Sequence, residues 1–196
     1  MTEEFISVKD RIISASIDII SDAGLMSLDT KNISRRTNIT EAMLYRYYSN
    51  TDEILSDIID YYFRFDSSIF STLKSRDSSN IEKIYMYLDA YGSYYNSYYS
   101  LSAIMLQYEF LLHNTVVREK VVNGYLTRRN FLVGIFKSAI EENEIADTFT
   151  PEQLADIIMG LVQVNTLNRR MVNYKNSLKE ELKDIADKFL NDLLLK

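Results

Sequence analysis

Residues 29–48, DTKNISRRTNITEAMLYRYY, constrain the fold of this chain more than any other stretch. Asp29 is a good N-cap for a short helix, and Ile33 marks the inward side of that helix. Asn38 ends the helix, because asparagine tolerates the left-handed conformation of a tight turn, and Thr40 caps a second helix. The pattern predicts two short helices at the spacing of a helix-turn-helix.

The flanking residues extend this motif into a larger unit. Residues 12–23 have the apolar spacing of an amphipathic helix, which Gly24 closes. On the other side, Asn50 caps a long helix and Glu53 follows three residues later. The sequence therefore predicts a three-helix unit that leads directly into a fourth helix ending near Leu73.

This N-terminal third resembles the TetR family of transcriptional regulators. The resemblance rests on the order and spacing of Ile12, Ile13, Ala15, Gly24, Ile33, Ile39, Thr40, Leu44, Tyr45, Tyr48, Asp52, Ile54 and Leu55. It implies an all-α protein with an N-terminal three-helix helix-turn-helix domain, residues 1–55. A long helix would join that domain to a helical effector-binding and dimerisation domain, residues 56–196. The implied function is a ligand-responsive regulator, of the repressor type, that binds a palindromic operator as a homodimer and is released by a small effector.

The resemblance also indicates which residues would contact double-stranded DNA. They are Lys31, Arg35, Arg36, Thr40, Glu41, Ala42, Met43, Tyr45, Arg46 and Tyr47. Glu41 and Thr51 depart from the family, in which lysine is common near these positions. A carboxylate at Glu41 suits the helix dipole but opposes the phosphate backbone, and it could instead accept a hydrogen bond from a cytosine amino group. The sequence leaves both interpretations of Glu41 open.

The distribution of charge bears on this interpretation. The chain has a formal net charge of −6, whereas residues 28–50 contain four basic and two acidic side chains. An acidic body with a mildly basic tip fits a regulator that presents one end to DNA, with modest and salt-sensitive affinity. The acidic departures favour an alternative, a helical dimeric module of the same fold that binds a small molecule or a protein and has lost operator binding.

Tyrosine is concentrated in residues 81–99, where its spacing makes both sides of a helix aromatic. This pattern is typical of a core with an exposed aromatic rim, and the alternative interpretation is a cavity wall for an amphipathic molecule. The second interpretation, with the family resemblance, predicts a pocket for a largely apolar or aromatic effector with one polar end. Its expected lining is Tyr62, Phe65, Tyr91, Tyr95, Tyr108 and Tyr125. Arg128 or Arg129 would be the anion partner, unless both arginines only pair with the acidic surface.

The two C-terminal helices are predicted over residues 151–171 and 178–195. Apolar residues cover more of the first helix than one-sided packing needs, and they form a single stripe on the second. We therefore expect a homodimer through residues 151–195, with one-sided packing within the subunit as the alternative for the last helix. The expected interface residues are Ile157, Leu161, Val164, Leu182 and Phe189.

Several functions are not expected. The sequence has no cysteine and a single histidine, His113, and it contains no phosphate-binding loop, paired nucleophile or clustered metal ligands. We expect neither catalysis nor a cofactor nor a metal site. No stretch is apolar enough to span a membrane, and the acidic N-terminus is unlike a secretory signal, so we expect a cytoplasmic protein without a membrane partner.

Overall fold

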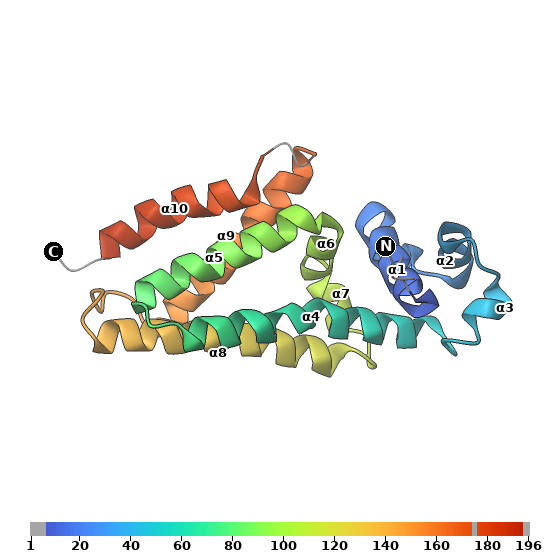
Figure 1. Ribbon diagram of the computed structural model, residues 1–196, viewed down its shortest axis with the longest axis horizontal. Helices are drawn as coiled ribbons and strands as arrows, with labels where there is room; N and C mark the ends of the chain where they lie inside the picture. Colours follow the sequence, from blue (N-terminus) through green and yellow to red (C-terminus); the bar gives the residue numbers. More distant parts are fainter. Residues whose placement is uncertain (1–6, 174–175, 194–196) are drawn as a thin grey trace, which may run out of the picture. The chain divides into compact units, whose positions relative to one another are not determined.

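The computed structural model describes residues 7–173 and 176–193, and every regular element in these ranges is a helix (Figure 1). The predicted all-α fold is confirmed. The chain forms two compact units, one reaching to Phe63 and including Ser100–Val122, the other comprising Arg64–Tyr99 and the residues from Asn123 onward. The division falls inside the two longest helices, α4 (Thr51–Ser75) and α8 (Arg118–Glu141). The functional division after residue 55 remains a prediction.

The first unit combines the N-terminal helices with a short segment from the middle of the chain. Beside parts of α4 and α8 it contains α1 (Val8–Ala23), the 3-10 turn η1 (Leu25–Ser27), α2 (Thr30–Thr37), α3 (Glu41–Leu44), α6 (Ser102–Met105) and α7 (Tyr108–Leu112). Isoleucines of α1 form its core and pack against α2 and α6. The apolar run of residues 101–113 predicts one helix. The structure instead has two short helices, because the N–H groups of Leu106 and Gln107 turn to carbonyls three residues back.

The second unit is built from α5 (Asn80–Ser97), α9 (Pro151–Met171), α10 (Leu178–Leu193) and the remaining parts of α4 and α8, and the 3-10 turn η2 (Tyr99–Leu101) follows α5. Local sequence signals start two of these helices. The spacing of Ser79 to Glu82 and of Thr150 to Gln153 predicts a capping box at each helix start, and both boxes are formed. Figure 1 shows α10 lying along α5, against which it makes its most extensive packing. None of the helices in the described ranges is long and apolar enough to cross a membrane.

The close approach of α5 and α10 depends on Gly92. A Cβ atom at this position would lie 2.7 Å from the backbone Cα of Lys179, closer than two carbon atoms can pack. We expect Gly92→Ala to destabilise the protein by about 1–3 kcal/mol, because the two backbones must move apart. Gly134→Ala is the matched control, since a Cβ there meets nothing within 4 Å and a helical alanine stabilises by about 0.5–1 kcal/mol relative to glycine. Thermal or urea unfolding measures both effects, and equal stabilities of the two variants would contradict this account of Gly92.

Candidate DNA-binding and effector sites

The predicted helix-turn-helix is formed, and the predicted residues cap its helices. Asp29 accepts a hydrogen bond from the backbone N–H of Asn32 at 2.7 Å and so begins α2. Asn38 adopts the left-handed conformation at the end of α2, with φ 56° and ψ 39°. The hydroxyl of Thr40 accepts from the N–H of Met43 at 3.1 Å and begins α3. These side-chain contacts fix the geometry of the turn.

The second helix of the motif is shorter than predicted. Regular helix ends at Leu44, after which the N–H groups of Arg46 and Tyr47 bond to carbonyls three residues back in a tightened turn. The turn carries Tyr48 inward, where it is buried and its hydroxyl donates to Asp57 of α4 at 2.8 Å. The ammonium of Lys9, on α1, binds the same carboxylate at 2.9 Å. The recognition segment, residues 40–48, is therefore held at its start by the Thr40 cap and at its end by the hydrogen bond from Tyr48 to Asp57.

The Asp57 carboxylate is stabilised in its ionised form by these partners. Burial works to raise the pKa of Asp57, but hydrogen bonds from Lys9 and Tyr48 outweigh it, and the pKa lies below its usual value. Conversely, burial and the hydrogen bond to Asp57 raise the pKa of the Tyr48 hydroxyl. Tyr48 therefore stays neutral, and the contact between the recognition segment and α4 persists at physiological pH.

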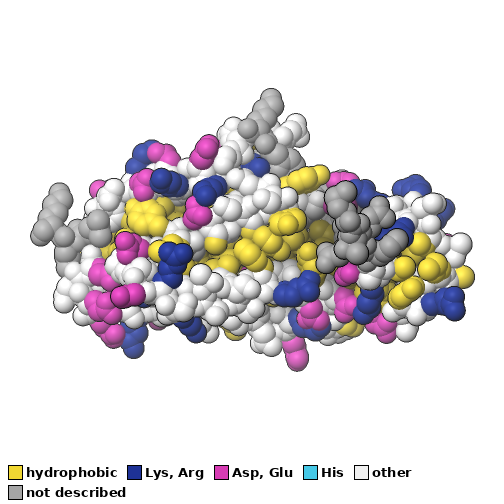
Figure 2. Space-filling model, viewed as in Figure 1, with side chains coloured by type: hydrophobic (Ala, Val, Ile, Leu, Met, Phe, Trp, Pro, Cys, Tyr) yellow, Lys and Arg dark blue, Asp and Glu magenta, His cyan; other side chains and the backbone are white. Residues whose placement is uncertain are grey.

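The outer surface of this segment carries the predicted contact residues. Tyr45 is 54% exposed and Tyr47 is 41% exposed, with Arg46 exposed between them. Thr40 and Ala42 are also exposed, and Met43 is half-buried. Figure 2 shows basic side chains beside hydrophobic ones over the end of the unit formed by α2 and α3. The surface thus combines flat aromatic groups with positive charge.

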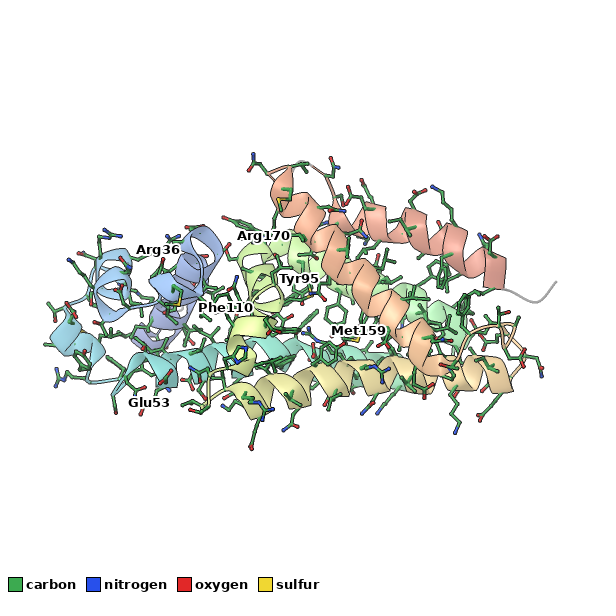
Figure 3. All side chains as sticks on the ribbon, turned by 180° about the vertical axis from the view of Figure 1, so that it is seen from behind. Arg36, Glu53, Tyr95, Phe110, Met159 and Arg170 are labelled. Carbon is green, nitrogen blue, oxygen red and sulfur yellow. The ribbon has the colours of Figure 1, made fainter. Side chains whose placement is uncertain are left out.

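The basic residues of α2 differ in how their charges are used. Arg36 lies between α2 and α1 (Figure 3), where it pairs with Asp22 at 2.9 Å and approaches Asp18 at 3.7 Å. Arg35 donates to the side chain of Asn32. Within the described residues, the side chains of Lys31 and Arg46 make no hydrogen bond or ion pair, so their charges are the most available for a phosphate or a base. The sequence could not distinguish Arg36 from these two, because its partners lie on another helix.

Glu41 has a contact that the sequence did not predict. Its carboxylate accepts a hydrogen bond from the hydroxyl of Thr30, the first residue of α2, at 2.6 Å. This bond ties the beginning of α3 to the beginning of α2. The carboxylate of Glu41 is therefore already engaged within the motif, a third possibility beside the two that its position in the sequence suggested.

The predicted effector residues are divided between the two units. In the first unit, the hydroxyl of Tyr108 donates to that of buried Tyr62 at 3.1 Å, and their rings meet edge to face. In the second unit, Tyr91 and Tyr95 are buried and one turn apart on α5. Phe65 meets Tyr91 edge to face and stacks on Tyr94 with ring centroids 3.9 Å apart, and Tyr125 is half-buried on α8.

Arg128 is engaged within the protein rather than available to a ligand charge. Its guanidinium donates two hydrogen bonds to the carboxylate of Asp66, at 2.6 and 2.9 Å, and Arg128 is only 4% exposed. The hydroxyl of Tyr91 donates to the same carboxylate at 2.6 Å. Arg129 is likewise paired, with Asp156 of α9 at 2.7 and 2.9 Å, near the surface. Each arginine therefore already has a carboxylate partner within the subunit, and its role as an anion partner of an effector remains a prediction.

No role was predicted for Asp66 from the sequence, although the spacing of its neighbours indicates that it is buried. Asp66 lies four residues after Tyr62 and four before Phe70, so a helix places it on their buried side. A carboxylate on that side needs a buried cation. Arg128 interrupts an apolar row of α8 and could have been paired with it.

The predicted dimer surface is partly available on the second unit. On α9, Ile157 and Val164 are exposed and Leu161 is half-buried, and these three residues recur at helical spacing. On α10, Phe189 is half-buried. Leu182 is completely buried within the subunit, where α10 packs on α5 and α9, so its assignment to the interface is corrected. The buried row of α10 follows four-residue spacing through Ala186, which a hydrophobicity pattern undervalues because alanine is small.

Within the described ranges, no group of three or more histidine, aspartate or glutamate side chains is placed to hold a metal ion. His113 is exposed at the end of α7, and its Nε2 lies 3.4 Å from a carboxylate oxygen of Glu109, one turn earlier.

Comparison with known proteins relates the architecture to solved structures. No family model and no curated protein matches the sequence. PfmR, a TetR-family regulator from Thermus thermophilus, is 16% identical with a TM-score of 0.79, over 97% of this chain and 99% of that one. FadR from Bacillus subtilis, solved with stearoyl-CoA, is 19% identical with a TM-score of 0.77, over 93% and 98%. AibR, solved with isovaleryl coenzyme A and operator DNA, is 17% identical with a TM-score of 0.75, over 95% and 97%. The chain therefore has the fold of the TetR-family transcriptional regulators, as the resemblance implied.

Proposed function

We propose that this protein is a ligand-responsive transcriptional regulator that binds a palindromic operator as a homodimer. The observation that carries the proposal is the exposed surface of Tyr45, Arg46 and Tyr47 on a fully capped helix-turn-helix within the TetR fold. Such a motif can present arginine to guanine and aromatic rings to base edges and sugars in the major groove. The proposed role is non-enzymatic, and repression is its expected direction.

Arg46 is expected to contribute directly to operator affinity. Arg46→Ala should weaken binding to an inverted repeat upstream of the protein's own gene by about 1–3 kcal/mol, because an exposed, unpaired guanidinium reaches the DNA. Gel retardation measures the affinity, with Lys188→Ala on α10 as a control for charge removal and thermal melting as a check on folding. A loss that is equal on specific and random DNA assigns Arg46 to a phosphate. If Arg46→Ala and Tyr45→Ala both leave retardation unchanged, the proposed DNA surface is wrong.

The proposed effector is a largely apolar molecule with an anionic end. Its support is the cluster of buried aromatic residues on α5 and the two structures of this fold that hold acyl-CoA. A CoA thioester of a fatty acid is therefore the first compound to test. To regulate, it must bind one conformation of the dimer better than the other, since a ligand with equal affinity for both shifts nothing. Operator affinity measured with and without stearoyl-CoA tests this, and tight binding without a change in operator affinity would exclude that compound as effector.

A second candidate is a dimeric binding protein of the same fold that no longer reads DNA. Glu41 favours it, because a carboxylate stands at the start of the recognition helix. The hydrogen bond from Thr30 to Glu41 reduces the force of that argument, since it engages the carboxylate within the motif. Ligand binding without operator retardation would favour this candidate.

A further inference from the structure

A groove of about 580 Å³ opens on the second unit between the end of α4, the beginning of α5 and the middle of α8. Its volume lies within the range of small-molecule sites. Its lining residues were not among those expected to bind an effector. Lys74 comes from α4, Lys83 from α5, and Asn130, Phe131 and Gly134 from α8.

The groove has an aromatic floor. Phe131 stacks on Phe70 with ring centroids 4.2 Å apart and planes 18° apart. The ring of Tyr87, buried behind it on α5, lies 6.5 Å from that of Phe131 and 4.5 Å from that of Tyr91. The floor therefore adjoins the tyrosine-rich part of α5, and Phe131 supplies a flat surface for a ring.

Two lysine side chains of the groove, Lys74 and Lys83, lie beside this aromatic floor. The ammonium of Lys74 lies 5.9 Å from the centroid of the Phe131 ring, and Lys83 lines the same groove. Figure 2 shows a basic side chain beside hydrophobic ones over the first turns of α5. No acidic side chain is among the lining residues. Two flexible ammonium groups next to an aromatic ring suit a phosphate ester that carries a flat base.

The neighbouring carboxylates accept hydrogen bonds at the start of α5. Glu144 accepts hydrogen bonds from the backbone N–H groups of Asn80 and Ile81, each at 2.9 Å, and so caps α5. Burial works to raise the pKa of Glu144, but these bonds and the charge of Lys83 lower it below its usual value. Glu142 accepts from the amide of Asn80 at 3.0 Å. The cap holds the first turn of α5, which carries Lys83, in a fixed position.

We propose that this groove binds the nucleotide end of the effector, with phosphate groups on Lys74 and Lys83 and the base on Phe131. The inference rests on the proposed function for the nature of the effector, and it adds a second subsite that recognises charge and a flat ring. The apolar part of the same ligand would be recognised by the aromatic residues of α5. Recognition of the two ends by separate subsites explains how an anionic ligand is selected although Arg128 and Arg129 are already paired.

The test uses the full-length protein and adenosine 3′,5′-bisphosphate, with adenosine as the uncharged comparison and isothermal calorimetry as the readout. Lys74→Ala and Lys83→Ala should each weaken bisphosphate binding about tenfold, because each removes a hydrogen bond to a charged group. Lys183→Ala, on α10 and outside the groove, should leave the affinity unchanged. Adenosine should bind the original protein more weakly than the bisphosphate does.

A blocking variant separates binding from folding. A Cβ at Gly134 meets no atom within 4 Å, so Gly134→Leu places its side chain in the groove without displacing the core. It should abolish bisphosphate binding while the melting temperature is maintained or raised. Bisphosphate binding that survives Gly134→Leu, or that is indifferent to both lysines, would overturn the inference. Operator retardation is measured in parallel. If the groove variants do not affect bisphosphate binding but the protein still retards the operator, the inference about the groove is wrong and the proposed function is not affected.

Discussion

Asp66→Ala is expected to destabilise the second unit by about 3–5 kcal/mol, because it leaves the guanidinium of Arg128 buried without its counter-charge. Arg128 is almost inaccessible to water, and two of its hydrogen bonds end on Asp66. The hydroxyl of Tyr91 loses its acceptor as well. Urea unfolding by circular dichroism measures the change, which is large relative to the roughly 5–15 kcal/mol of a typical domain.

The matched experiment replaces both members of the ion pair. Asp66→Leu combined with Arg128→Met removes the charges together and fills their space with apolar groups, so it should recover most of the lost stability. If Asp66→Ala alone costs less than about 1 kcal/mol, then the pair is hydrated in solution and is not a buried anchor between α4 and α8. A double variant that is as unstable as the single one would show that packing rather than charge sets the cost.

Val164→Asp is expected to convert the proposed dimer to monomers at micromolar concentration and to weaken operator binding by about 10²-fold or more, since two linked reading heads bind with high effective concentration. Val164 is 54% exposed in the subunit, so the substitution leaves the subunit core intact. In an interface centred on α9 it would bury an unpaired carboxylate. Multi-angle light scattering and operator retardation measure the two effects.

The control for this experiment lies one residue away. Gln163→Asp introduces the same charge on a different side of α9 and should leave both the mass and the operator affinity unchanged. A monomeric mass for the unmodified protein would refute the homodimer. A dimer that tolerates Val164→Asp as well as it tolerates Gln163→Asp would place the interface on another surface.

Features with a local cause could be predicted from the sequence. The caps at Asp29, Asn38 and Thr40 each depend on a side chain and backbone groups within a few residues, and all three form as predicted. The capping box of Thr150, with Pro151 at the first helical position, follows the same logic. Local hydrogen bonds need no knowledge of the tertiary fold, which is why the helix starts were predictable.

Features that depend on distant partners could not be predicted. The local patterns indicate that Asp66 and Arg128 lie on buried sides of their helices, but the two residues are 62 apart in the sequence and the patterns do not specify that they meet. Leu182 on α10 and Val164 on α9 are both apolar, and both helices were predicted to dimerise. The packing of α10 against α5 buries Leu182 in the subunit, whereas Val164 is exposed. The choice of partner for an apolar face is a tertiary property. For the same reason the sequence could not reveal the groove, because Lys74, Lys83 and Phe131 come from three different helices.

The measurement that tests the central claim most directly is a footprint of the purified protein on the DNA upstream of its own gene. The proposed function predicts protection of two symmetric half-sites, centred about one or more turns of the double helix apart. The protection should withstand excess random DNA and disappear for the Tyr45→Ala, Arg46→Ala double variant. Protection that is uniform along the fragment, or that is unaffected by this double variant, would contradict sequence-specific binding through the helix-turn-helix.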